Sequence, residues 1–183
     1  LFDLPENHLR TATALEVCAG YKLFNVVVDT DRTGSLILEK GRLRKRVTIV
    51  PLNKITSRVV RPEILNEAKR QAPEKVELAL NLVEYDNSVK KAIEFVFGNK
   101  LICEDPETAK KVTFSDKIKT GSITLEGDNY DPEGRLSGGS RRTSSSLISK
   151  FAKYKALKDD VTKIRHRLDE ISSIIRKINL VAD

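Results

Sequence analysis

The sequence predicts a mixed α/β (α+β) body of two related subdomains, followed by a C-terminal coiled-coil helix. Three observations support this fold class. Segments with helical and strand-like patterns alternate as far as residue 125. A pattern from the first half of the body recurs in the second half. From Tyr154 onward, apolar residues repeat at steps of three and four, as in a coiled coil.

Each element of the body is bounded by residues that start or stop it. Asp, Ser and Pro stand at helix starts, and Gly20, Gly41 and Gly98 end three helices as C-cap residues do. Helices are therefore expected at 12–19, 33–40, 62–71, 88–97 and 106–112. The apolar runs between them predict strands at 23–29, 47–52, 76–83, 100–103 and 122–125.

A weak internal repeat divides the body. The residues Ala14-Leu15-Glu16, Gly20 and Lys22-Leu23 recur 78 residues later as Ala92-Ile93-Glu94, Gly98 and Lys100-Leu101. Each copy has the order helix, glycine, strand, helix, strand. We predict two similar subdomains, 1–58 and 82–146, joined by a connecting segment over 59–81. Chance similarity is the alternative.

The segment 147–183 predicts one long helical arm. Its heptad positions are Tyr154, Leu157, Val161, Ile164, Leu168, Ile171, Ile175 and Ile178. Such a stripe is stable only against a second helix, and no other segment has a comparable pattern. The partner helix is expected from a second chain or from sequence before Leu1. An amphipathic helix docked on its own body is the alternative. The absence of Met predicts a piece of a longer chain.

Composition and motifs argue against an enzyme. The 183 residues are 39% hydrophobic and 32% charged, and no apolar run is long enough to cross a membrane. His8 and His166 have no metal-ligand spacing around them, and no phosphate-binding glycine motif occurs. We predict no catalytic residue, metal or cofactor in this sequence, and no membrane partner. Cys18 and Cys103 lie in apolar runs and are predicted to be buried thiols of a reducing compartment.

A glycine-rich segment follows the last predicted strand. Leu136-Ser137-Gly138-Gly139 matches a signature of ATP-binding-cassette ATPases, but the phosphate loop and Mg²⁺ ligands which that role requires are missing. Gly134, Gly138 and Gly139 permit positive φ and the close approach of another backbone beside the strand at 122–125. We predict that a partner protein pairs with a strand edge here. The interface residues are Gly134, Leu136, Ser137, Gly138 and Gly139.

The net charge of +7 is unevenly spread. Two windows, 42–62 and 134–158, contain basic residues and no acid, and both are expected to flank the junction of body and arm. Such patches hold phosphate by charge, so we expect DNA as a partner, with single strands as one candidate form. Solvated charge without a ligand is the alternative. The residues expected to contact DNA are Arg42, Arg44, Lys45, Arg135, Arg141, Arg142, Lys150 and Lys153.

The glycine-rich segment resembles a known family. The pattern Gly127-Asp128-x-x-Asp131-Pro132-x-Gly134-x-Leu136-Ser137-Gly138-Gly139, followed by a coiled coil, is similar to the hinge of structural maintenance of chromosomes (SMC) proteins. The segments 12–16, 23–29, 46–55, 82–86 and 94–98 resemble condensin SMC subunits of the second eukaryotic type. The segment 104–111 resembles their fungal members.

The resemblance implies a doughnut-shaped hinge of two subdomains and a heterodimer with the condensin SMC paralogue of the fourth type. The family's interface motif maps onto Gly134, Gly138 and Gly139. ATP and Mg²⁺ would act at head domains outside this sequence, and non-SMC condensin subunits would also bind elsewhere. The implied role is mitotic chromosome condensation, in the nucleus on chromosomes and in the cytoplasm for part of the cell cycle. A structural connector without DNA contact is the alternative.

Overall fold

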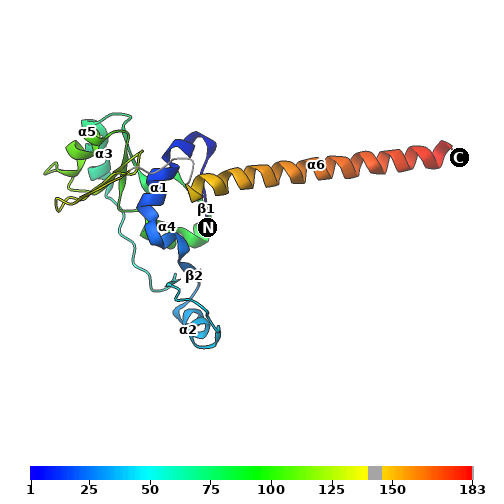
Figure 1. The fold of residues 1–183 in the computed structure, drawn as a ribbon, viewed down its shortest axis with the longest axis horizontal. Coiled ribbons are helices and arrows are strands. Elements are labelled where there is room, and N and C mark those ends of the chain that lie inside the picture. The colour runs from blue at the N-terminus through cyan, green and yellow to red at the C-terminus, as the bar shows by residue number, and fades with distance from the viewer. Residues whose placement is uncertain (140–145, 183) are drawn as a thin grey trace.

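The computed structural model describes residues 1–139 and 146–182, with side chains described as far as residue 177. A body of helices and short strands holds the first part of the chain. The helix α6 (Leu147–Ala182) leaves this body as a long arm (Figure 1). The mixed fold class and the C-terminal helix are therefore confirmed.

The largest sheet has five strands in the order β4-β6-β7-β8-β9. Strands β6 and β7 are parallel, and the crossover between them contains α5 (Pro106–Thr113). The other neighbouring strands are antiparallel. The strands are β4 (Val76–Leu78), β6 (Leu101–Cys103), β7 (Ser122–Thr124), β8 (Asn129–Tyr130) and β9 (Leu136–Ser137).

Helices cover both faces of this sheet. On the face of Leu101 and Cys103, the packed helices are α3 (Pro62–Gln71) and α5. On the face of Ile102 and Ile123 they are α1 (Ala12–Ala19) and α4 (Lys90–Phe97). The central strands β6 and β7 are buried on both faces, as expected for a sheet covered by helices on both sides.

A smaller unit repeats the same connection. Strands β2 (Val26–Val28) and β3 (Ile49–Pro51) are parallel and are joined by α2 (Asp31–Lys40). The two crossover helices start alike, because Thr30 Oγ1 accepts the Thr33 N–H at 3.2 Å and Asp105 Oδ1 accepts the Thr108 N–H at 2.7 Å. The two halves of the internal repeat thus contain connections of the same form.

The subdomain boundaries stay a prediction. Strand β4, inside the predicted connecting segment 59–81, pairs with β6 of the five-stranded sheet. Near the arm, β1 (Phe2–Asp3) pairs with β5 (Glu84–Tyr85) and so links the start of the chain to its second half.

Helices match the sequence prediction better than strands do. Helices α1 and α3 have the predicted bounds, and α2, α4 and α5 differ by one or two residues at one end. The predicted strand 76–83 is wrong in its second half, where a 3₁₀ helix covers Ala79–Leu82. A short apolar run does not distinguish a buried strand from a buried helical turn. The two-residue strands β1, β5, β8 and β9 were not predicted, because they are too short to show alternation.

Both cysteines are free thiols, and burial raises the pKa of each to about 12. Cys103 is buried as predicted, whereas Cys18 retains some exposed surface, which corrects the prediction for that residue. We expect iodoacetamide at pH 8 to alkylate both thiols roughly a thousandfold more slowly than a free thiol, and Cys103 more slowly than Cys18. Both should react at the free-thiol rate in denaturant. Rapid alkylation of Cys103 in the folded chain would contradict the structure.

Candidate dimer and nucleic-acid interfaces

Strand β9 is an edge of the five-stranded sheet. Strand β8 pairs with one side of it, and within the described ranges no strand pairs with its other side. Both of its residues are exposed, and Leu136 keeps 60% of its surface. The predicted strand at 122–125, in contrast, is β7 and is paired on both sides by β6 and β8. The open edge beside the glycines is therefore β9, which the sequence did not reveal.

The pairing register shows which backbone groups this edge presents. The Asp131 N–H donates to the Arg135 carbonyl at 2.9 Å, and the next pair along the ladder is Tyr130 with Leu136. Hydrogen-bonded and non-hydrogen-bonded pairs alternate in an antiparallel ladder. The N–H and C=O of Leu136 therefore point away from β8, as do those of Gly138 two residues later. Within the described residues, the two N–H and two C=O groups of Leu136 and Gly138 are therefore free to form hydrogen bonds with a strand added at this edge.

Of the three predicted interface glycines, Gly134 is required by the fold of the chain itself. Gly134 has φ of 92°, and its N–H donates to the Asp131 carbonyl at 2.9 Å in the turn between β8 and β9. A three-residue hairpin loop needs a positive φ at this point. A Cβ on Gly138 would meet only the carboxylate end of the Asp128 side chain, which can move aside. Gly139, like Gly134, borders open space, and it lies next to β9 outside the hairpin turn.

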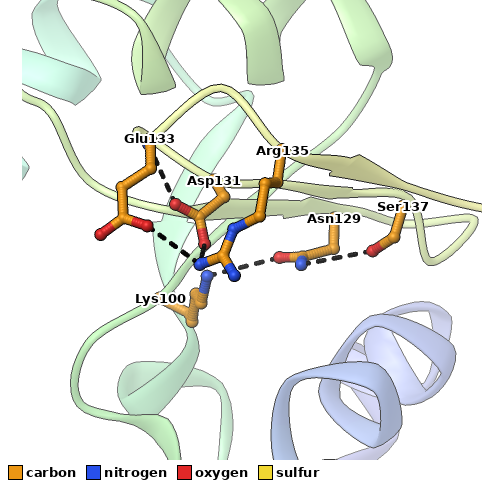
Figure 2. Close-up of polar contacts among 6 residues, drawn as sticks. All are labelled: Lys100, Asn129, Asp131, Glu133, Arg135 and Ser137. Atoms are coloured by element: carbon orange, nitrogen blue, oxygen red, sulfur yellow. Dashed lines mark hydrogen bonds and ion pairs between the residues drawn. The ribbon is translucent and has the colours of Figure 1, made fainter.

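A chain of side-chain contacts ties β9 to its own sheet. Figure 2 shows Lys100 Nζ donating to Asn129 Oδ1 at 3.3 Å and Asn129 Nδ2 donating to Ser137 Oγ at 3.5 Å. The hydroxyl oxygen of Ser137 thus accepts a hydrogen bond from its own sheet, while its O–H remains available as a donor. The edge therefore offers a partner its backbone, the apolar side chain of Leu136 and the O–H of Ser137.

Arg135, a predicted DNA contact, is held by two carboxylates. Its Nη2 lies 3.0 Å from Asp131 Oδ2 and 3.1 Å from Glu133 Oε2 (Figure 2). The Glu133 N–H, and after it the charge of Arg135, lower the pKa of Asp131. A phosphate would have to displace these carboxylates, so we expect Arg135 to contribute less to phosphate binding than its charge suggests.

The other predicted DNA contacts lie in two separate places. Five of them are exposed and have no ion pair in the described part of the chain. Arg42, Arg44 and Lys45 lie in the loop between α2 and β3. Lys150 and Lys153 lie at the root of α6. The loop lies at the far end of the β2–α2–β3 unit, away from the arm (Figure 1). The expectation that both basic windows flank the junction is therefore wrong for the loop. Arg141 and Arg142 lie outside the described residues.

A family comparison identifies the chain. Residues 1–113 match the model described as "SMC proteins Flexible Hinge Domain". The chain belongs to the SMC hinge family. The resemblance that rested on the glycine-rich segment is confirmed, although the matched residues end before that segment begins.

Curated relatives extend the match along nearly the whole hinge. "Structural maintenance of chromosomes protein 2" of Saccharomyces cerevisiae is 55% identical over 172 residues, which cover 94% of this chain and 15% of that protein. The human protein of the same name is 48% identical over 150 residues, 81% of this chain and 12% of that protein. The hinge thus spans under a fifth of the length of these relatives.

A solved structure shares the fold. The asymmetric dimer of the Geobacillus stearothermophilus SMC hinge domain superposes with a TM-score of 0.66 and 25% identity. The match covers 90% of this chain and 67% of that one.

A groove of about 590 Å³ lies at the root of the hinge's arm, between the start of the chain and α6. Phe24, Phe151 and Lys153 are among the residues that line it, and Phe24 is 71% exposed. The sequence did not single out Phe24, because an aromatic residue in an apolar run is typical of the hydrophobic core.

Within residues 1–139 and 146–182 no cluster of His, Cys, Asp or Glu could hold a metal ion. No helix there is long and apolar enough to cross a membrane.

Proposed function

We propose that this hinge is the dimerisation domain of a condensin SMC subunit of the second type, and that it joins this subunit to the SMC paralogue of the fourth type. The open edge of β9 carries the proposal, because an unpaired strand edge is completed most directly by a strand from another chain. The 55% identity to Saccharomyces cerevisiae structural maintenance of chromosomes protein 2 supports the subunit type. The dimer described for the Geobacillus hinge supports pairing between hinges.

The chemistry of the edge suits strand addition. Leu136 and Gly138 supply backbone donors and acceptors, and Gly138 and Gly139 carry no side chain that would hold a partner strand away. Covering the exposed part of Leu136 would add about 1 kcal/mol of hydrophobic stabilisation. Each backbone hydrogen bond would add a similar net amount, about 1 kcal/mol.

Size-exclusion chromatography with light scattering tests this function. Mixed with the hinge of the fourth-type paralogue, the chain should elute as a one-to-one complex. The same hinge incubated with an unrelated hinge-sized protein provides the baseline. Separate elution of the two hinges at micromolar concentration would contradict the proposal.

We propose in addition that the hinge contacts DNA through its basic surface. Exposed Phe151 stands beside Lys150 and Lys153 at the arm root. Tyr154, whose ring lies 6.4 Å from that of Phe151, begins the heptad stripe that a second arm helix would cover. Cations that hold phosphate next to aromatic rings that stack on bases are typical of single-strand binding. The loop with Arg42, Arg44 and Lys45 would supply a second, separate contact. This combination favours DNA binding over the alternative of a purely structural connector.

The wider role belongs to the same proposal. The whole protein would act in mitotic chromosome condensation, on chromosomes in the nucleus and in the cytoplasm for part of the cell cycle. ATP and Mg²⁺ would bind at head domains outside this chain, and non-SMC condensin subunits would bind other regions. No catalytic step is assigned to the hinge itself.

A further inference from the structure

The junction between body and arm contains a contact between residues far apart in the sequence. The carboxylate Oε2 of Glu16, in the middle of α1, accepts the N–H of Leu147, the first residue of α6, at 2.7 Å. The N–H groups in the first turn of a helix lack partners within the helix. A negative charge at this end also interacts favourably with the helix dipole. Glu16 therefore caps the arm from a different element.

The arm has no carboxylate of its own to do this. No Asp or Glu occurs in α6 before Asp159, and its first turns carry Lys150 and Lys153 instead. Ser146 contributes a neutral cap, because its Oγ accepts the Ser149 N–H at 3.3 Å. The negative charge at the start of the arm thus comes from Glu16.

The arm touches the body only over its first turns among the residues described. Ile148 inserts into the core that contains α1 and α4 and is 7% exposed. Lys155 pairs with Asp3 of β1, and this contact raises the pKa of Lys155. Nearly every described side chain between 156 and 177 is exposed. A small rotation of the first turn of α6 against the body would change the direction of the whole arm. The contact at Leu147 holds this first turn.

The internal repeat gives the second observation. Glu94 stands in α4 at the position that corresponds to Glu16, and its Oε2 accepts the Ser57 hydroxyl at 2.9 Å. Ser57 lies in the segment that leaves β3, just as Leu147 lies in the segment that leaves the second half of the body. Each half thus holds, through the equivalent glutamate of its first helix, the segment that leaves the other half.

We propose that Glu16 is the positioning residue that fixes the direction of the arm relative to the hinge body. Its carboxylate locks the first turn of α6 to α1, while Ile148 and the Asp3–Lys155 pair hold the next turns. Because α1 also packs against the five-stranded sheet, the root of the arm moves with the body that carries β9. The inference does not depend on pairing with a second hinge, which can be measured separately on the same variants.

Distance measurements on the 183-residue chain test this inference. Spin labels on cysteines placed at Lys110 in α5 and Lys163 in α6, both exposed, report the arm's direction by double electron–electron resonance. Labelled chain is diluted into excess unlabelled chain, so that only distances within one chain are seen. Glu16→Ala should broaden the distance distribution about twofold or more, and exchange of the Leu147 amide should speed up about fivefold, the loss expected for one helix cap.

Two further variants make the result specific. Glu16→Gln keeps an oxygen that accepts the Leu147 N–H but removes the charge, so its distribution should lie between those of the native chain and Glu16→Ala. Glu94→Ala removes the equivalent contact of the other half and should leave the arm distances unchanged. A native distance distribution in folded Glu16→Ala, or equal broadening in Glu94→Ala, would overturn the proposal.

Discussion

Replacing Leu136 with proline is expected to weaken pairing with the partner hinge strongly while the chain stays folded. The Leu136 N–H points away from β8, so proline removes no hydrogen bond within the sheet. Proline is tolerated in edge strands at such positions. A partner strand, however, would lose a donor and meet the proline ring. We expect affinity to fall by roughly a hundredfold, the sum of the lost hydrogen bond and the steric exclusion.

Leu136→Ala is the matched control for this variant. It keeps the backbone N–H and removes most of the exposed side chain, so it should weaken pairing by only about tenfold or less. Isothermal titration calorimetry with the paralogue hinge measures both affinities, and far-UV circular dichroism confirms folding. Native affinity of Leu136→Pro would show that the partner does not pair with β9.

Reversing the charges of Lys150 and Lys153 is expected to weaken DNA binding by roughly tenfold or more at low salt. Each lost phosphate contact should also lower the slope of log affinity against log salt by about 0.7 on single strands and 0.9 on duplex. The measurement is a fluorescence anisotropy titration of the Lys150→Glu, Lys153→Glu variant at several salt concentrations. Both side chains are exposed, so folding should be unaffected.

Two comparisons locate the DNA surface. Lys117→Glu with Lys119→Glu changes the net charge equally at exposed positions after α5, and should shift affinity far less. Reversal of Arg42, Arg44 and Lys45 tests the loop of the β2–α2–β3 unit independently. Equal losses from the control pair and the arm-root pair would mean that only net charge matters, and the connector without DNA contact would then be favoured.

The sequence predicted the helices because their patterns are long, and it located the buried strands β6 and β7 by apolar runs bounded by helix signals. Helix α3 starts at a proline and has an apolar stripe, and β6 is a continuous apolar run between Gly98 and Pro106. The repeat of Ala14-Leu15-Glu16 indicated two equivalent helices. In the structure each of their glutamates accepts a hydrogen bond from a segment that leaves the other half, Glu16 from the Leu147 N–H and Glu94 from the Ser57 hydroxyl. The shortest strands could not be predicted, since two residues show no periodicity.

The sequence predicted a strand edge beside the glycines, and the interface there stays a prediction. The glycine-rich segment does lie at a sheet edge, but that edge is β9, formed by the segment itself. The sequence could not show that Gly134 is required by the hairpin turn, because this depends on the pairing of Asp131 with Arg135. Nor could it show that Arg135 is paired with two acids, or that the two basic windows lie apart, because both depend on the tertiary fold.

Amide hydrogen exchange in β9, with and without the partner hinge, tests the central claim most directly. The Ser137 amide belongs to a pair already bonded to β8, whereas the Leu136 and Gly138 amides point outward. Addition of the partner should slow exchange at Leu136 and Gly138 by about tenfold or more and change Ser137 much less. Unchanged exchange at Leu136 and Gly138 in a saturated complex would contradict the pairing of β9 with a second hinge.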